Sequence, residues 1–68
     1  MLMPGKKVYI ELYAINVHET EDAVLFKEEE EDEEGIWIPK SVLGDYPEKD
    51  YEGIVEIEKW FAINEELI

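Results

Sequence analysis

The chain has 68 residues, and 19 Asp and Glu side chains against 6 lysines give it a formal net charge of −13 at pH 7. This length is too short for a two-domain enzyme. The negative charge argues against binding to a nucleic-acid backbone, because affinity for phosphates comes largely from Lys and Arg. Hydrophobic residues make up 46% of the chain, too large a share for a disordered acidic tail. We therefore predict one small β-rich domain over residues 1–68, with no direct nucleic-acid binding.

The absence of cysteine excludes disulfides and thiolate metal sites, and His18 is the one histidine. We therefore predict no cofactor and no metal site. A domain of about this size buries only about 60% of the surface of its unfolded chain, so it needs dense aromatic packing, a partner or self-association. The sequence leaves a homodimer open. No segment reaches the ~20 apolar residues of a membrane span and no signal peptide is visible, so we expect no membrane association.

The first half of the chain predicts a hairpin of two strands. Residues 6–17 alternate with a period of two, because Val8, Ile10 and Leu12 are separated by larger polar or aromatic side chains. Residues 18–22 (HETED) are polar and typical of a turn. Residues 23–27 (AVLFK) are rich in residues that favour strands and predict the second strand.

An unbroken acidic run follows the hairpin and is the most unusual feature of the sequence. Adjacent like charges oppose compaction, so residues 28–34 predict a solvated loop. Carboxylates displayed in this way could also mimic phosphate and occupy a basic groove. A calcium site is a third interpretation, but the run lacks the spacing of an EF-hand loop. The run consists of Glu28, Glu29, Glu30, Glu31, Asp32, Glu33 and Glu34.

The second half predicts two more strands and a terminal helix. Residues 36–38 form the third strand, which Pro39 ends, and residues 53–58 form the fourth. Residues 59–67 are predicted to be helical, with Trp60, Ile63 and Leu67 on one face. The fold class is mostly β (α+β): four short strands in a small SH3-like or OB-like open barrel, plugged at one end by the C-terminal helix.

Three segments, HETEDAVLF, GIWIPKSVL and EKWFAINEELI, carry the most distinctive pattern of the chain. They resemble a family of small uncharacterised proteins from phages, prophages and other mobile elements, whose pattern reads ET-x-x-A-I/V-L, then W-I/L-P-x-S, then W-x-A-x-x-x-x-L-I/V. Glu66 departs from it, since glycine often stands there. The resemblance implies a short β-rich domain in a viral or mobile-element context, without an established activity. The matching residues are Glu19, Thr20, Ala23, Val24, Leu25, Trp37, Ile38, Pro39, Ser41, Trp60, Ala62, Leu67 and Ile68.

Aromatic residues are the other candidates for partner contact. Tyr46 and Tyr51 flank a proline in a polar loop, which fits either an adaptable contact surface or packing against the barrel. Trp37 alternates with two isoleucines and faces the opposite side of its strand. We expect both Trp60 and Trp37 to lie in the core or to pack against a helix, whereas the alternative for each is an exposed contact surface.

The sequence contains no recognisable catalytic arrangement. His18 is predicted to lie at the surface, and no spacing links it to Ser41 or Asp45 as a base to a nucleophile. We therefore predict a non-enzymatic binding protein in the host cytoplasm. It would inhibit a basic nucleic-acid-handling or defence protein by mimicking phosphate charge. The alternative is an accessory or scaffold subunit that docks through aromatic contacts onto a phage replication or recombination protein.

Overall fold

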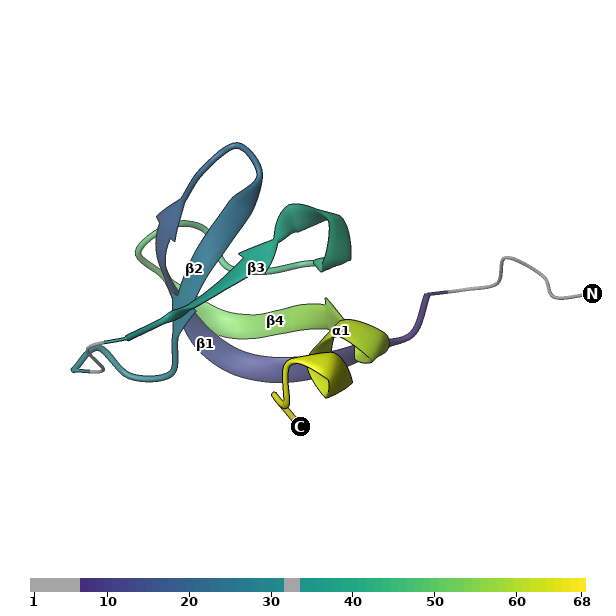
Figure 1. Cartoon of the computed structure of the whole chain (residues 1–68). Coiled ribbons are helices and arrows are strands. Elements are labelled where there is room, and N and C mark those ends of the chain that lie inside the picture. Colours follow the sequence, from purple (N-terminus) through teal and green to yellow (C-terminus); the bar gives the residue numbers. More distant parts are fainter. Residues whose placement is uncertain (1–6, 32–33) are drawn as a thin grey trace, which may run out of the picture.

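The alternating apolar residues pair into one antiparallel sheet with the strand order β3-β2-β1-β4 (Figure 1). The computed structural model describes residues 7–31 and 34–68. The predicted mostly β fold, with four strands and a C-terminal helix, is confirmed, and the sheet is open. The elements are β1 (Tyr9–Glu19), β2 (Ala23–Lys27), β3 (Ile36–Pro39), the 3-10 helix η1 (Lys40–Val42), β4 (Glu52–Glu58) and α1 (Lys59–Asn64).

Strand β1 is shared between two neighbours and bends between them. Its residues from Tyr9 to Ile15 pair with β4, and those from Ile15 to Glu19 pair with β2. The register with β2 shifts between Asn16 and His18, so Val17 is the extra residue of a β-bulge. A bulge bends its strand and increases the local twist. The hairpin of β2 and β3 therefore stands across the ribbon of β1 and β4 (Figure 1).

The inward faces of the four strands build one small core. Val24, Val55 and Ile57 are almost completely excluded from solvent, and each alternates with more accessible neighbours as the pleat requires. Helix α1 contributes Ala62, whose small side chain allows the helix to approach the sheet closely. The buried hydrophobic residues are Ala14, Val24, Phe26, Ile38, Val42, Val55, Ile57 and Ala62.

The segment after η1 runs along the outer edge of β4. Leu43 forms an antiparallel bridge with Ile57, and the Gly44 amide donates to the carbonyl of Glu56 at 2.8 Å. The amide of Glu56 in turn donates to the carbonyl of Asp45 at 2.9 Å. These bonds cover part of an edge that would otherwise be free to pair with another strand.

The C-terminal helix differs from the prediction in length and in its buried face. It ends at Asn64, because the chain reverses there to return Leu67 to the sheet. The Leu67 amide donates to the carbonyl of Ala62 at 2.8 Å, and the Glu66 amide donates to that of Ile63 at 3.1 Å. This is the Schellman pattern, with Glu66 in the left-handed region at φ +59°.

The prediction that Trp60 lies in the core is wrong. Trp60 is 56% exposed, and Ile63 one turn later is exposed as well. The helix instead turns Ala62 and part of Phe61 toward the sheet. The Trp60 ring packs edge-on against Phe61 at 5.7 Å between centroids, and its indole N–H donates to Oε1 of Glu58 at 2.8 Å.

Substituting Glu66→Gly should stabilise the domain by roughly 0.5–1 kcal/mol. A left-handed backbone costs a residue with a Cβ about 1–2 kcal/mol, and glycine recovers this minus its own entropy loss. Chemical denaturation monitored by tryptophan fluorescence measures the change. The matched control is Glu65→Gly, which replaces a residue at φ −94° and should destabilise. Equal effects of the two substitutions would contradict the role given to the positive φ.

Candidate functional site

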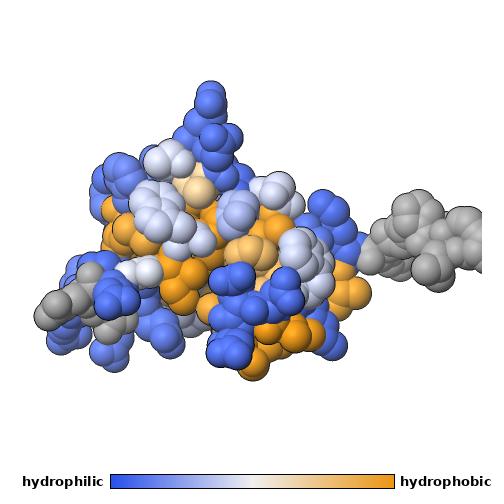
Figure 2. Space-filling view, viewed as in Figure 1, coloured by the Kyte–Doolittle hydropathy of each residue, from blue (hydrophilic) through white to orange (hydrophobic). Residues whose placement is uncertain are grey.

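An apolar cleft of about 480 Å³ opens on the concave side of the sheet. Core residues of β2, β3 and β4 line it, namely Phe26, Ile38, Val55 and Ile57, together with the partly buried Leu12 of β1. Ile36 from β3 and Leu67 from the C-terminal segment line it as well. Figure 2 shows hydrophobic side chains gathered in the middle of the face it displays, with hydrophilic ones around them. This volume lies within the range of ordinary ligand pockets. It is large for a domain of this size.

Charged side chains line the same cleft and give it a negative electrostatic potential. Glu28, Glu34 and Glu66 contribute three carboxylates, and Lys27 contributes one ammonium group. The three glutamates are exposed to solvent. Because apolar walls lower the local dielectric constant, charges at such an opening act more strongly on an incoming ligand than charges on an open surface. The arrangement suits a ligand that is apolar in its centre and positively charged around it.

Gly35 allows the acidic loop to join the cleft wall. A Cβ atom at this position would lie 2.8 Å from both Cδ1 of Leu25 and the carbonyl oxygen of Phe26. The backbone therefore passes closer to β2 than any larger residue permits. The next residue, Ile36, pairs with Phe26 and remains 44% exposed.

The acidic run lies between β2 and β3, as predicted, and its described residues belong to neither strand. Glu28, Glu29, Glu30 and Glu31 are exposed, as is Glu34 at the start of the return to β3. Asp32 and Glu33 lie outside the described residues. In Figure 1 the described residues of this connection lie at the lower left, beyond the sheet. We call Glu28–Glu31 and Glu34 the acidic loop, and it adjoins the cleft because Glu28 and Glu34 line it.

Three ion pairs join lysines to carboxylates that lie outside the acidic loop. Nζ of Lys40 lies 2.8 Å from Oε2 of Glu19, and Lys7 and Lys49 pair at 3.5 and 3.4 Å with Glu58 and Asp50. A second stretch of acids, at positions 45, 48, 50 and 52, is also exposed. The surface therefore has carboxylates in more than one place, and the acidic loop is distinguished by its position beside the cleft.

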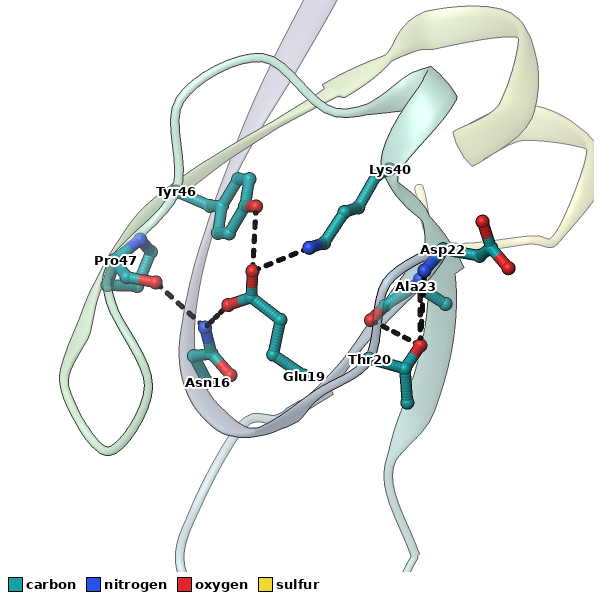
Figure 3. A network of polar contacts seen from close by, with 8 residues as sticks. All are labelled: Asn16, Glu19, Thr20, Asp22, Ala23, Lys40, Tyr46 and Pro47. Atoms are coloured by element: carbon teal, nitrogen blue, oxygen red, sulfur yellow. Dashed lines mark hydrogen bonds and ion pairs between the residues drawn. The ribbon is translucent and has the colours of Figure 1, made fainter.

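A buried amide holds the bend of β1 to the loop before β4 (Figure 3). Asn16 is completely buried, and its Nδ2 donates to the carbonyl of Pro47 at 2.9 Å and to Oε1 of Glu19 at 3.2 Å. Its backbone amide donates to the carbonyl of Tyr51 at 3.0 Å, and its carbonyl accepts from the Asp50 amide at 2.7 Å. Its Oδ1 has no hydrogen-bond partner among the described residues. One residue therefore holds the loop before β4 at Pro47, Asp50 and Tyr51.

Glu19 connects this amide to the 3-10 helix. The ammonium group of Lys40, followed by the amide of Asn16, holds the pKa of Glu19 below its ordinary value of 4.5. The same contact raises the pKa of Lys40. The hydroxyl of Tyr46 donates to Oε2 of Glu19 at 3.3 Å. The carboxylate of Glu19 thereby connects β1, the 3-10 helix η1 and the loop before β4 (Figure 3).

The structure separates the aromatic residues that the sequence grouped as candidate contacts. The expectation that Trp37 packs in the core or against a helix is wrong, because Trp37 is 49% exposed on the outer side of β3 and its ring meets His18 edge-on at 5.9 Å. Tyr51 is exposed, whereas Tyr46 is half-buried with its ring edge-on to Phe26 at 6.1 Å. Burial and the neighbouring carboxylate of Glu19 raise the pKa of Tyr46. Tyr46 therefore packs the loop against the core, while Trp37 and Tyr51 present surface for contact.

Sequence reasoning missed both Asn16 and the cleft. Asn16 stands in the otherwise apolar run AINV, and a single polar residue on the inward face of a strand is a signal that could have identified it. The cleft combines residues that lie far apart in the chain, such as Leu12, Ile36 and Leu67. No local pattern connects them.

Neither a metal cluster nor a membrane span is found in the described part of the chain. Residues 7–31 and 34–68 contain no group of three or more His, Asp or Glu placed to hold a metal ion. No helix within these residues has the length and apolar character needed to cross a bilayer. Comparison with protein-family models, curated proteins and solved structures found no match.

Substituting Asn16→Asp should destabilise the domain by about 3 kcal/mol or more at pH 7. The new carboxylate would lose the donor to Pro47 and would lie unpaired in the interior, close to the carboxylate of Glu19. Thermal denaturation measures the loss. The control is Asn64→Asp on the exposed surface of α1, where a change within about 0.5 kcal/mol is expected. Similar losses in both variants would show that the buried amide has no special role.

The contribution of Glu19 to stability should depend on pH. Because its pKa is lower in the folded protein than in the unfolded chain, its stabilising effect is present above pH 4.5 and is lost as the pH falls through the folded pKa. The melting temperature of Glu19→Gln should therefore lie below that of the wild type at pH 7, and the gap should close toward pH 3. Glu21→Gln, an exposed change in the adjacent turn, is the control. A gap that is independent of pH would contradict this role.

Proposed function

We propose that the protein is a non-enzymatic binding module that recognises the basic surface of a partner protein. The observation that carries this proposal is the position of the acidic loop, which displays exposed Glu28–Glu31 beside an electronegative cleft. With a net charge of −13, the whole molecule also attracts a positive partner from a distance. Such attraction increases the association rate and selects against acidic partners.

The spacing of the charges supports phosphate mimicry as the mode of recognition. Consecutive glutamates in an exposed loop place several negative charges within one Debye length, about 8 Å at physiological salt. A groove that binds nucleic acid presents Lys and Arg at comparable density, because phosphates supply much of that affinity. We infer that the partner is a nucleic-acid-handling or defence protein and that the chain inhibits it by occupying this groove in the host cytoplasm. The resemblance to mobile-element proteins supports such a setting.

Exposed aromatic residues favour a second candidate function, an accessory subunit that docks through apolar contacts. Trp37 and Tyr51 are accessible, and Trp60 and Ile63 expose one side of α1. Tryptophan and tyrosine are enriched among residues that dominate interface energies. In this case the charges would keep the free subunit soluble, and removing them would leave binding intact.

Neutralising the acidic loop should weaken binding to a basic surface far more than neutralising other acids. In the variant Glu28→Gln, Glu29→Gln, Glu30→Gln and Glu31→Gln, affinity for poly-lysine in low salt should fall about tenfold or more, because clustered charges act together. Titration calorimetry between about 50 and 200 mM salt measures this, and wild-type affinity should fall steeply over the range.

The control removes the same number of exposed carboxylates elsewhere, at Glu11, Glu21, Glu48 and Glu65. A loss equal to that of the loop variant would show that charge acts diffusely and would contradict the proposed role of the loop. Affinity that is independent of salt in the wild type would contradict the proposed function itself. For a partner recovered from host lysate, loss of binding in Trp37→Ala but not in the loop variant would establish the accessory function instead.

A further inference from the structure

We propose that the apolar cleft receives a bulky apolar side chain from a basic peptide segment of the partner. This inference rests on the proposed function and specifies what the partner must carry besides positive charge. It assigns two parts to one binding surface. The acidic loop attracts Lys and Arg, and the cleft beside it accepts an apolar anchor.

The cleft lining supplies the apolar half of the argument. Phe26, Ile38 and Val55 belong to the buried core and also line the cleft. Leu12 and Leu67 are partly buried against the same core. A side chain placed here would therefore extend the core of the domain, and burial of such a group is the main source of affinity at interface hot spots.

The charges select the chemistry of the occupant. Among the described lining residues, Glu28, Glu34 and Glu66 are opposed by one basic side chain, Lys27, so fatty acids, nucleotides and acidic peptides are repelled. A second copy of this chain, with its net charge of −13, is disfavoured for the same reason. A peptide with Lys or Arg on both sides of an apolar residue meets both requirements.

The cleft and the acidic loop share residues, so the apolar and the charged parts of the surface can contact the same ligand. The loop leaves β2 at Glu28 and returns through Glu34 and Gly35 to Ile36, and all four residues line the cleft. A ligand attracted to the exposed loop is therefore already at the opening. Ile36 is half-exposed at this position, so it is accessible to the anchor without opening of the core.

The test compares two labelled lysine-rich peptides of equal length and charge, one with a central Leu-Trp-Leu segment and one with Ser-Gly-Ser in its place. Fluorescence anisotropy should show about tenfold tighter binding of the apolar peptide at low salt, as expected for burial of one bulky side chain. At high salt both should weaken, with the ratio between them preserved. In the wild type, the apolar peptide alone should shift the amide resonances of Leu12, Ile36, Ile38 and Leu67.

A matched pair of variants locates the effect. Ile36→Ser and Ile54→Ser each remove a half-exposed isoleucine from a strand, and Ile36 lines the cleft whereas Ile54 is outside it. The preference for the apolar peptide should fall at least threefold in Ile36→Ser and persist in Ile54→Ser. Equal binding of the two peptides, or resonance shifts confined to other residues, would overturn the cleft proposal and leave the proposed function standing. Failure of both peptides to bind would overturn the two together.

Discussion

The buried amide of Asn16 is the interaction on which the shape of the domain depends. Asn16 lies at the bulge where β1 passes from β4 to β2. Its side-chain Nδ2 donates to the carbonyl of Pro47 and its backbone N–H donates to that of Tyr51, so both groups hold the loop that leads into β4. A buried polar group stabilises the fold only through the hydrogen bonds it makes, and here Nδ2 makes two whereas Oδ1 makes none among the described residues. The bend that it supports folds one half of the sheet across the other. The core and the cleft are two parts of the space enclosed in this way.

The bend also explains why a small domain retains an apolar opening. A flat four-stranded sheet would expose a whole face, whereas full closure would bury all of it and leave no site. Here the segment from Leu43 to Asp45 covers the edge of β4, and α1 covers part of the core with Ala62. The side near Ile36 and Leu67 remains open. This opening lowers the stability of the fold, because apolar area that stays in contact with water contributes nothing to the free energy of folding.

The sequence predicted features that depend on local residue patterns, such as the strands, and missed features that depend on tertiary contacts. Alternation located the first strand, and strand-favouring residues between turn signals located the other three, although β1 extends through His18 and Glu19, which were predicted to lie in a turn. The acidic run was predicted to lie in the connection where its described residues are found. The bulge at Val17 has no signature in the residue types around it. The helix ended early because Leu67 packs against the core, a contact that helical periodicity does not encode. Trp60 was misplaced for a related reason, since the close approach of Ala62 leaves no room for an indole beneath the helix.

Charge and apolar surface act on different stages of binding, which is why their juxtaposition matters more than either alone. Electrostatic attraction raises the association rate but discriminates poorly among basic partners, and physiological salt largely screens it at separations greater than about 8 Å. Burial of an anchor acts mainly on dissociation and rejects partners that lack one. A molecule with a net charge of −13 and no apolar recognition would bind many basic proteins weakly. In the proposed function, the cleft lined by Glu28 and Glu66 supplies the apolar contact that such a preference requires.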